Sequence, residues 1–219
     1  MTVLVSSVVS KMRKNLNDIG LVRWDESEHI GAINDALDAI LIAAPDLYED
    51  HRNVTLVAGN EQSLPDDGYL LFDVLWNVSA AGVQGRRITK VAKSALDRAR
   101  SAWSESGEDS VVRHWAQDKK QKAKYYVAPR QPESESNKVR IRLARRPVDA
   151  TEQTDELDTP DEMESAVYYY AMMRMLEKDE KFSGSKQSMA FMQKFSMAVQ
   201  VRGAGEDAAE ATKQQNEGS

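Results

Sequence analysis

The chain has 219 residues, of which 41% are hydrophobic and 29% charged, and it contains no cysteine. This composition is typical of a globular chain with one core or two small ones. The lack of cysteine excludes disulfides, thiolate metal sites and a cysteine nucleophile. The longest nearly apolar run, Ala36 to Pro45, is far shorter than the roughly 20 residues of a membrane span, so we expect no membrane insertion. Near the N-terminus the basic residues follow the apolar ones, which argues against a secretory signal.

The formal net charge of −6 conceals two neighbouring blocks of opposite sign. Arg113 to Arg146 holds eleven Lys or Arg and three acids, whereas Asp149 to Glu164 holds eight acids and no base. Because such blocks attract one another between molecules, their proximity favours self-association of like subunits.

Two helices are predicted at the N-terminus. Apolar residues recur every three to four positions from Val3 to Asp18, with basic residues on the other face. Asp25 followed by Glu28 has the form of a capping box. It opens a second helix that runs to Ala44, before Pro45. We expect the two helices to pack antiparallel.

The middle of the chain reads mainly as short strands. Alternation predicts one from Arg52 to Ala58, ended by Gly59-Asn60, and another from Arg86 to Val91. Tyr69 to Val78 fits either a strand or a short helix, because its periodicity does not separate the two. Lys93 to Trp103 is predicted as a helix.

The clearest strands are Lys124 to Ala128 and Lys138 to Ala144. In the second, three apolar residues alternate with basic ones, so one face should be buried and the other should carry a ladder of positive charge. The proline-containing segment between the strands is expected to be an exposed hairpin loop. The apolar set is Val139, Ile141 and Leu143, and the basic set is Lys138, Arg140 and Arg142.

The C-terminal part is predicted to be helical after an acidic linker, Val148 to Thr159. Thr159 and Pro160 form a helix start, with a hydroxyl cap and proline in the first turn. The helix should reach Phe182, and a last helix should follow from Lys186 to Val201. Gly203 to Ser219 has no apolar residue larger than alanine and is expected to be disordered in an isolated monomer.

These elements predict an α+β fold, mainly an α-helical bundle, with a small antiparallel β domain inserted between the N- and C-terminal helices. The expected divisions are an N-terminal helical pair over 1–50, a β-rich segment with a short helix over 51–148, a C-terminal helical hairpin completing the bundle over 149–202, and a flexible arm over 203–219.

Catalytic motifs are nearly absent from the sequence. His29, His51 and His114 lie far apart with no ligand spacing, and neither a phosphate-binding glycine loop nor a nucleophile elbow occurs. We therefore expect no enzyme activity, no metal and no cofactor. The candidate contact residues are the arginines at and after the last predicted strand, which fit either a solvated or charge-protected strand or contact with DNA or an acidic neighbour: Arg140, Arg142, Arg145 and Arg146.

The order of elements in the second half of the chain resembles a known family. The motifs are Leu96-Asp97, Trp103, His114-Trp115, the strand ending Tyr126 to Pro132, the strand closing at Pro147, Pro160 to Glu164, Ala166-x3-Tyr170-Ala171, Leu176-x2-Asp179 and Phe195. Together they resemble the head–tail adaptors of short-tailed bacteriophages, called tail tubular protein A or head-to-tail connectors, over roughly Val3 to Val201.

The resemblance implies a structural protein of the virion neck, made in the host cytoplasm. It would form a ring of twelve subunits between the portal protein and the tail tube or nozzle, and DNA would pass through its channel without sequence-specific contact. A C-terminal arm reaching the portal is also implied, with Glu206, Asp207, Glu210 and Lys213 as candidate contacts. The alternative function is a nucleic-acid-binding module that uses the basic region from Arg113 to Arg146.

Overall fold

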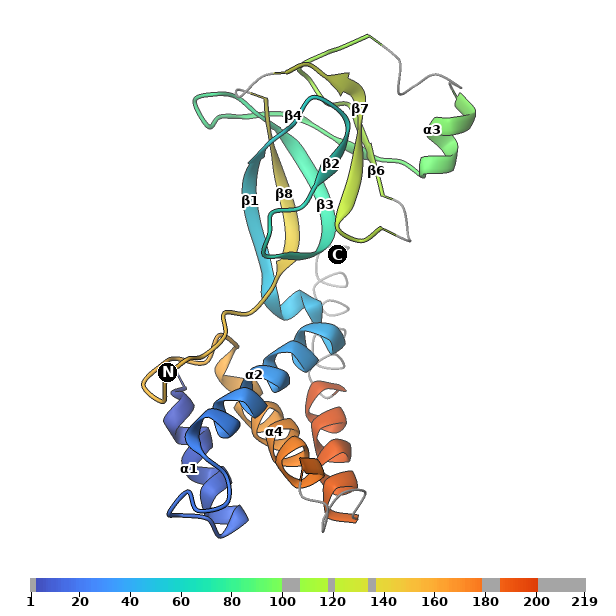
Figure 1. Ribbon diagram of the computed structural model, residues 1–219. Coiled ribbons are helices and arrows are strands. Elements are labelled where there is room, and N and C mark those ends of the chain that lie inside the picture. The colour runs from blue at the N-terminus through green and yellow to red at the C-terminus, as the bar shows by residue number, and fades with distance from the viewer. Residues whose placement is uncertain (1–2, 100–106, 118–120, 134–136, 179–185, 201–219) are drawn as a thin grey trace, which may run out of the picture. The chain divides into compact units, whose positions relative to one another are not determined.

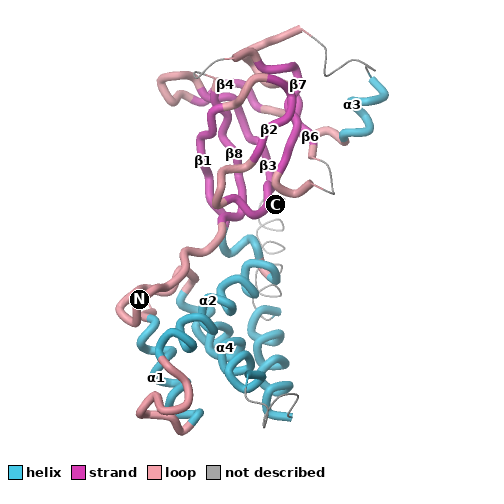
Figure 2. Tube along the Cα trace, in the orientation of Figure 1, coloured by secondary structure: helices cyan, strands magenta, loops and turns pink. Residues whose placement is uncertain are grey.

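The computed structural model describes residues 3–99, 107–117, 121–133, 137–178 and 186–200. The chain divides into two compact units, one formed by Met1–Leu47 with Pro147–Ser219 and the other by Tyr48–Arg146. Among the described residues, the first unit is built from helices, and the second holds the two sheets and one short helix (Figure 2). The α+β class expected from the sequence is therefore confirmed.

Among the residues described for the first unit there are four helices, and α2 and α4 form its centre (Figure 1). The last helix packs on α4 through aromatic rings, because Tyr170 and Phe195 meet edge to face at 5.0 Å and Tyr168 and Phe191 at 6.1 Å. The apolar stripes of α1, α2 and α4 are buried. The helices are α1 (Val5–Leu16), α2 (Glu26–Ala43), α4 (Glu164–Lys178) and residues 186–200, with 3₁₀ turns η1 (Pro45–Tyr48) and η3 (Asp161–Met163).

The predicted capping box at the start of α2 is confirmed. The Asp25 carboxylate accepts from the Glu28 backbone N–H at 2.9 Å, and the Glu28 carboxylate accepts from the Asp25 N–H at 3.0 Å. Two of the N–H groups at the helix start thus find acceptors.

The start of α4 differs from the prediction. The chain first makes the 3₁₀ turn η3, the residue at its N-cap is Pro160, and no side chain caps it. The Thr159 hydroxyl is buried and has no hydrogen-bond partner among the described residues. The prediction of a hydroxyl cap is wrong because Pro160 is extended (ψ 142°), so regular helix begins only at Glu164.

The acidic segment before α4 is more than a solvated linker. The Val5 N–H donates to the Asp155 carbonyl at 3.0 Å, and the Leu157 N–H donates to the Val3 carbonyl at 2.9 Å. Leu157 itself is buried. The Asp155 carboxylate folds the turn by accepting from the backbone N–H groups of Thr151 and Glu152, which hold its pKa below the usual range. The segment is therefore fixed against the N-terminus of α1.

The described part of the second unit contains two four-stranded sheets, ordered β1-β8-β3-β4 and β2-β7-β6-β5. The first is antiparallel, whereas the second is mixed because β5 and β6 run parallel. The segment Tyr69–Val78, which periodicity left open, is a strand. The elements are β1 (Glu49–Thr55), β2 (Gly59–Ser63), β3 (Gly68–Val78), β4 (Gln84–Arg87), β5 (Thr89–Lys90), α3 (Lys93–Ala99), β6 (His114–Ala116), β7 (Lys124–Gln131) and β8 (Lys138–Arg145).

One apolar core joins the two sheets. Val139, Ile141 and Leu143 of β8 are fully buried, as their alternation predicted, and they share a core with Trp115 and Tyr125 of the other sheet. Side-chain hydrogen bonds also connect β3 with the other sheet and with the segment that leads into it. The Trp115 Nε1–H donates to Asp73 Oδ1 at 3.1 Å, and the Asn77 side chain both donates to and accepts from the Val112 backbone at 2.8 Å.

The expected hairpin between the two clearest strands is wrong. β7 and β8 belong to different sheets, so the connection crosses from one sheet to the other. β7 also continues to Gln131, whose fully buried side chain donates to the carbonyls of Asp109 and Pro129 at 2.9 and 3.0 Å. These hydrogen bonds hold Pro129 and Gln131 in the sheet instead of a solvated loop.

Candidate functional site

Arg140 and Arg142 lie on the outward face of β8, opposite the buried apolar residues. β8 is an inner strand of its sheet, between β1 and β3, so these charges do not protect an edge. Residues that oppose each other on neighbouring antiparallel strands point to the same face. Arg140 is opposite Asn53 on β1 and Trp76 on β3, and Trp76 is opposite Arg87 on β4. These four side chains therefore form one row across the sheet.

Arg142 is the second basic group of this face, and its neighbours are both acidic and aromatic. Its guanidinium lies 3.4 Å from Glu49 and 5.4 Å from the centroid of Phe72. Glu49 also pairs with His51 at 3.0 Å. We name Arg87, Arg140, Arg142, Trp76 and Phe72 the Arg–aromatic face. Its aromatic half was missed from the sequence because Tyr69–Val78 gave no sign of pairing with β8.

Arg145 does not belong to the Arg–aromatic face. It has the same parity along β8 as Ile141 and Leu143, and it lies near a carboxylate pair at one end of the sheet. There Arg52 bridges Asp50 and Asp67 at 2.5 and 2.7 Å. These hydrogen bonds from Arg52, with a smaller effect of the Arg145 charge, hold the pKa of both carboxyls below the usual range.

Arg146 lies just beyond β8 and is exposed, and its backbone N–H donates to the Asp67 carbonyl at 2.7 Å. The four arginines singled out from the sequence are thus separated. Two share an outward face, one lies near a carboxylate cluster, and one follows the strand. The candidate arm residues Glu206, Asp207, Glu210 and Lys213 lie outside the described residues.

The three histidines lie on three different elements and have different surroundings. His29 is buried in α2, and its Nδ1 donates to the Asp25 carbonyl at 2.8 Å, which places the proton on that nitrogen. His51 is on β1 beside Glu49, and His114 is exposed on β6. Across the described ranges, no group of three His, Asp or Glu side chains is placed to hold a metal ion.

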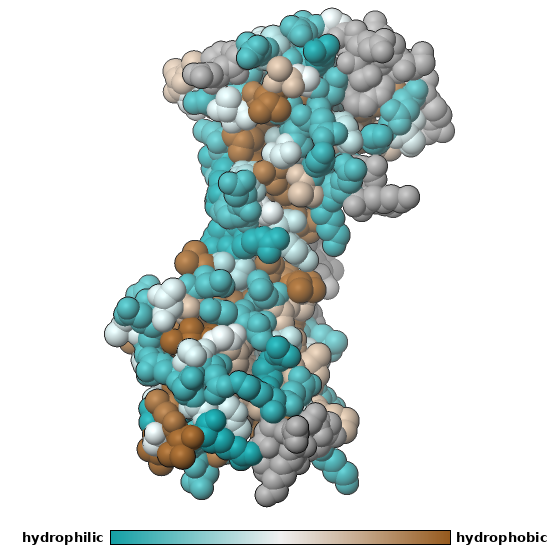
Figure 3. All heavy atoms as spheres, viewed as in Figure 1, coloured by the Kyte–Doolittle hydropathy of each residue, from teal (hydrophilic) through white to brown (hydrophobic). Residues whose placement is uncertain are grey.

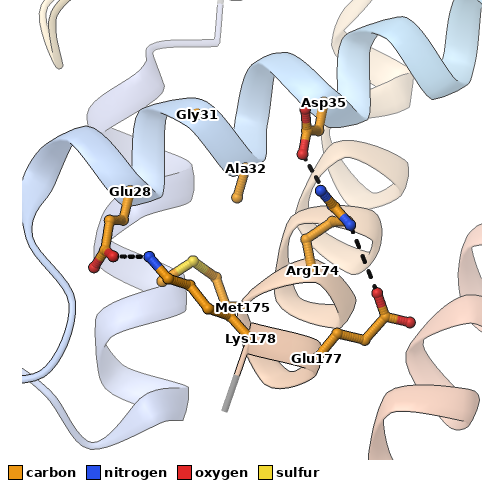
Figure 4. A pocket seen from close by; sticks show the side chains of 8 residues that line it. All are labelled: Glu28, Gly31, Ala32, Asp35, Arg174, Met175, Glu177 and Lys178. Carbon is orange, nitrogen blue, oxygen red and sulfur yellow. Dashed lines mark hydrogen bonds and ion pairs between the residues drawn. The ribbon is translucent and has the colours of Figure 1, made fainter. Parts of the chain in front are cut away.

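A shallow pocket of about 420 Å³ lies between α2 and α4 (Figure 4). Its uncharged lining residues are Gly31, Ala32 and Met175, and ion pairs link the two helices beside it. Glu28 pairs with Lys178, while Arg174 binds Asp35 at 2.9 Å and approaches Glu177 at 3.8 Å. The lining thus carries three carboxylates and two cations, and the ion pairs between α2 and α4 fix one helix against the other.

None of the described helices is both long and apolar enough to cross a membrane. The sequence matches the family described as SU10 adaptor protein over residues 3–216, and the chain belongs to this family. It is therefore a bacteriophage adaptor, a structural component of the virion, as the resemblance implied. No curated protein matches the sequence.

Proposed function

We propose that this adaptor is the head-to-tail connector of a short-tailed phage, similar to tail tubular protein A. In this proposal about twelve copies form a ring in the virion neck. The ring binds the portal protein on one side and the tail tube or nozzle on the other, and DNA passes through its channel. The observation that carries the proposal is the family match over residues 3–216.

The charge distribution supports assembly from like subunits. The Arg–aromatic face carries three arginines, and Asp149 and Glu152 are exposed in the acidic block. Arginine and tryptophan are among the residues enriched at the energetic centres of protein interfaces. We further propose that the protein acts without catalysis and needs neither a metal nor a cofactor.

Imaging of the purified chain with purified portal rings tests this function. The proposal requires an added ring of density on one face of the portal in negative-stain electron micrographs. Portal rings that stay bare at micromolar adaptor concentrations would contradict it. A matched mixture with an unrelated acidic protein of similar mass controls for non-specific adsorption.

A second candidate function is DNA contact by the Arg–aromatic face, because Trp76 and Phe72 lie beside Arg140 and Arg142. Each neutralised phosphate adds about 0.9 to the slope of log affinity against log salt for double-stranded DNA. Replacing Arg140 and Arg142 with Gln should lower that slope by about two units. A tighter affinity for single strands would indicate stacking on the aromatic rings.

A further inference from the structure

The sheet β1-β8-β3-β4 carries an excess of positive charge. Its four strands hold seven Lys or Arg and three carboxylates. Asp50 pairs with Arg52, and Asp73 accepts from an indole N–H of the other sheet. Of the three carboxylates, only Glu49 stands beside the outward cations, 3.4 Å from Arg142. The outward side therefore stays positive when all three are counted. Its cations are Arg87, Lys138, Arg140 and Arg142.

A negative surface of the same chain belongs to the helical unit. Residues 148–162 hold seven carboxylates and no Lys, Arg or His, and we call them the acidic segment. Asp149, Glu152 and Glu156 are exposed, and none of the three forms an ion pair with a described residue. The base that stands nearest along the chain is the exposed Arg146. Hydrophilic residues predominate on the surface of this segment, beside the N-terminus of α1 (Figure 3).

Hydrogen bonds fix the acidic segment in one shape. The Asp155 carboxylate accepts from the backbone N–H groups of Thr151 and Glu152 at 2.7 and 2.9 Å, and the Asp155 carbonyl accepts from the backbone of α1 at 3.0 Å. The first base of α1, Lys11, already pairs with Glu164 at 2.6 Å. The exposed carboxylates are thus preorganised, which reduces the entropy lost when they bind a cationic partner.

Apolar groups accompany the charges on both surfaces. Phe72 and Trp76 lie half-buried among the arginines of the Arg–aromatic face. Val148, the first residue of the acidic segment, is 69% exposed beside Asp149. A cationic face with two aromatic rings therefore matches a carboxylate-rich segment with an exposed valine, in charge and in polarity.

A second copy of the chain supplies a counter-charge for both surfaces at once. Bound DNA would supply one for the Arg–aromatic face only, and it would leave the acidic segment without a cationic partner. The two surfaces belong to different compact units, so the contact joins unlike surfaces of two copies. A head-to-tail contact of this kind closes into a ring when the rotation between subunits allows.

We propose that the Arg–aromatic face of one copy binds the acidic segment of a second copy of this chain, and that this contact repeats around the adaptor ring. The inference rests on the proposed function, because it assigns the subunit contact of the proposed ring. The contact pairs Arg87, Arg140 and Arg142 with the exposed carboxylates that begin at Asp149.

Charge reversal and rescue test the contact. Arg87→Glu with Arg140→Glu reverses the face, and Glu152→Arg with Glu156→Arg reverses the segment. Each double variant should self-associate about tenfold or more weakly, because like charges then meet. A chain that carries all four changes should recover its association, since the charges match again. Sedimentation velocity of the chain, alone and with portal rings, measures this.

The control for the reversed face changes the net charge by the same amount elsewhere. Lys14→Glu with Lys186→Glu alters two exposed lysines of the helical unit. This variant should associate like the native chain, and circular dichroism checks that every variant keeps its fold. Equal weakening in the control and in the reversed face would overturn the proposal, because net charge alone would then explain the effect.

Carbodiimide cross-linking tests whether the contact joins two copies. Arg140→Lys and Arg142→Lys keep the positive charge and add amines beside Lys138, and the reagent joins amines to carboxylates that touch them. The variant is prepared with light and with heavy nitrogen, and the two are mixed in equal amounts, alone and with portal rings. Mass spectrometry should find light–heavy peptide pairs between β8 and the acidic segment. Links confined to one isotope, or none between these segments, would overturn the proposal.

The outcomes separate this inference from the proposed function. Face-reversed variants that still form rings of unchanged mass would overturn the inference and leave the adaptor function standing. Variants that keep their rings but lose retention on DNA would assign the Arg–aromatic face to DNA, which also overturns it. A native chain that stays monomeric alone and with portal would contradict the proposed function itself.

Discussion

Asn34 on α2 exchanges two hydrogen bonds with the backbone of Ala150, 116 residues further along the chain. Its Nδ2 donates to the Ala150 carbonyl at 3.0 Å, and its Oδ1 accepts from the Ala150 N–H at 2.9 Å. Ala150 is buried, so both of its backbone groups depend on this one side chain. These two hydrogen bonds fix the segment around Ala150 against α2. Substitution of Asn34 should therefore lower the stability of the protein.

Asn34→Ala should lower the free energy of unfolding by about 1–3 kcal/mol, because it leaves a buried donor and a buried acceptor unsatisfied. Denaturant titration followed by circular dichroism measures this. Asn15→Ala is the matched control, since the Asn15 side chain donates to Lys11 at an exposed site. The control should change stability by less than about 0.5 kcal/mol. Equal losses in both variants would contradict the assigned role of Asn34.

The register of β8 makes a second prediction. Ile141→Ala should cost on the order of 2–4 kcal/mol, because Ile141 is fully buried between the sheets. Arg140→Gln and Arg142→Gln should each change stability by less than about 0.5 kcal/mol, because both positions face outward. Denaturant midpoints at neutral pH compare the three variants. A reversed order of costs would mean a register shifted by one residue.

Gly31 gives a third prediction. It lies inside α2, and a Cβ added there would meet no atom within 4 Å. Gly31→Ala should therefore raise the free energy of unfolding by about 0.5–1 kcal/mol, since alanine favours helix over glycine. Gly82→Ala is the opposite case, because Gly82 has a φ of +81° and alanine would be strained there. Thermal unfolding of both variants should show shifts of opposite sign.

The hydrogen bonds that Asp18 accepts predict that the free energy of unfolding depends on pH in the acid range. The N–H groups of Trp24, Val22 and Arg23 hold the pKa of Asp18 below its ordinary value of 3.8. The unfolded chain binds this proton more readily, so the stabilisation is complete above the ordinary pKa and is lost as the pH falls through the lower folded value. Melting curves between about pH 6 and pH 2 should show a smaller acid loss for Asp18→Asn than for the native chain. Asp38→Asn, an exposed residue on α2, should follow the native curve.

Removal of residues 203–219 tests the portal-binding arm that the family resemblance implies. The segment has no apolar residue larger than alanine, so its loss should leave the melting temperature of the protein unchanged. Binding to portal rings should weaken measurably, as judged by co-sedimentation at several adaptor concentrations. Replacing only Glu206, Asp207 and Glu210 with Gln separates a charge effect from a loss of length. If the truncated chain binds portal rings as tightly as the full chain does, residues 203–219 are not a portal-binding arm.

Local features were predictable from the sequence, because each depends on a few neighbouring residues. The capping box of Asp25 and Glu28 and the buried face of Val139 to Leu143 are of this kind. Pairing between distant segments was not predictable. The separation of β7 from β8, and the place of β3 beside β8, follow from which sheet each strand joins. Alternation within a strand does not show which sheet the strand joins, so the sequence wrongly predicted a hairpin between β7 and β8.

The candidate site likewise combines residues that the sequence identified with residues that it did not. Arg140 and Arg142 were identified because they alternate with apolar residues within one strand. Trp76 and Phe72 were missed because the register of β3 contains bulges that bring them beside those arginines. The Asp18 loop was also missed, because three hydrogen bonds from one carboxylate depend on a backbone turn with Leu21 at positive φ.

Native mass spectrometry of the chain, alone and with purified portal protein, tests the central claim most directly. The account predicts a discrete oligomer of about twelve subunits, either free or added as one complete set to the portal ring. A chain that remains monomeric at all concentrations and leaves the mass of the portal ring unchanged would contradict it.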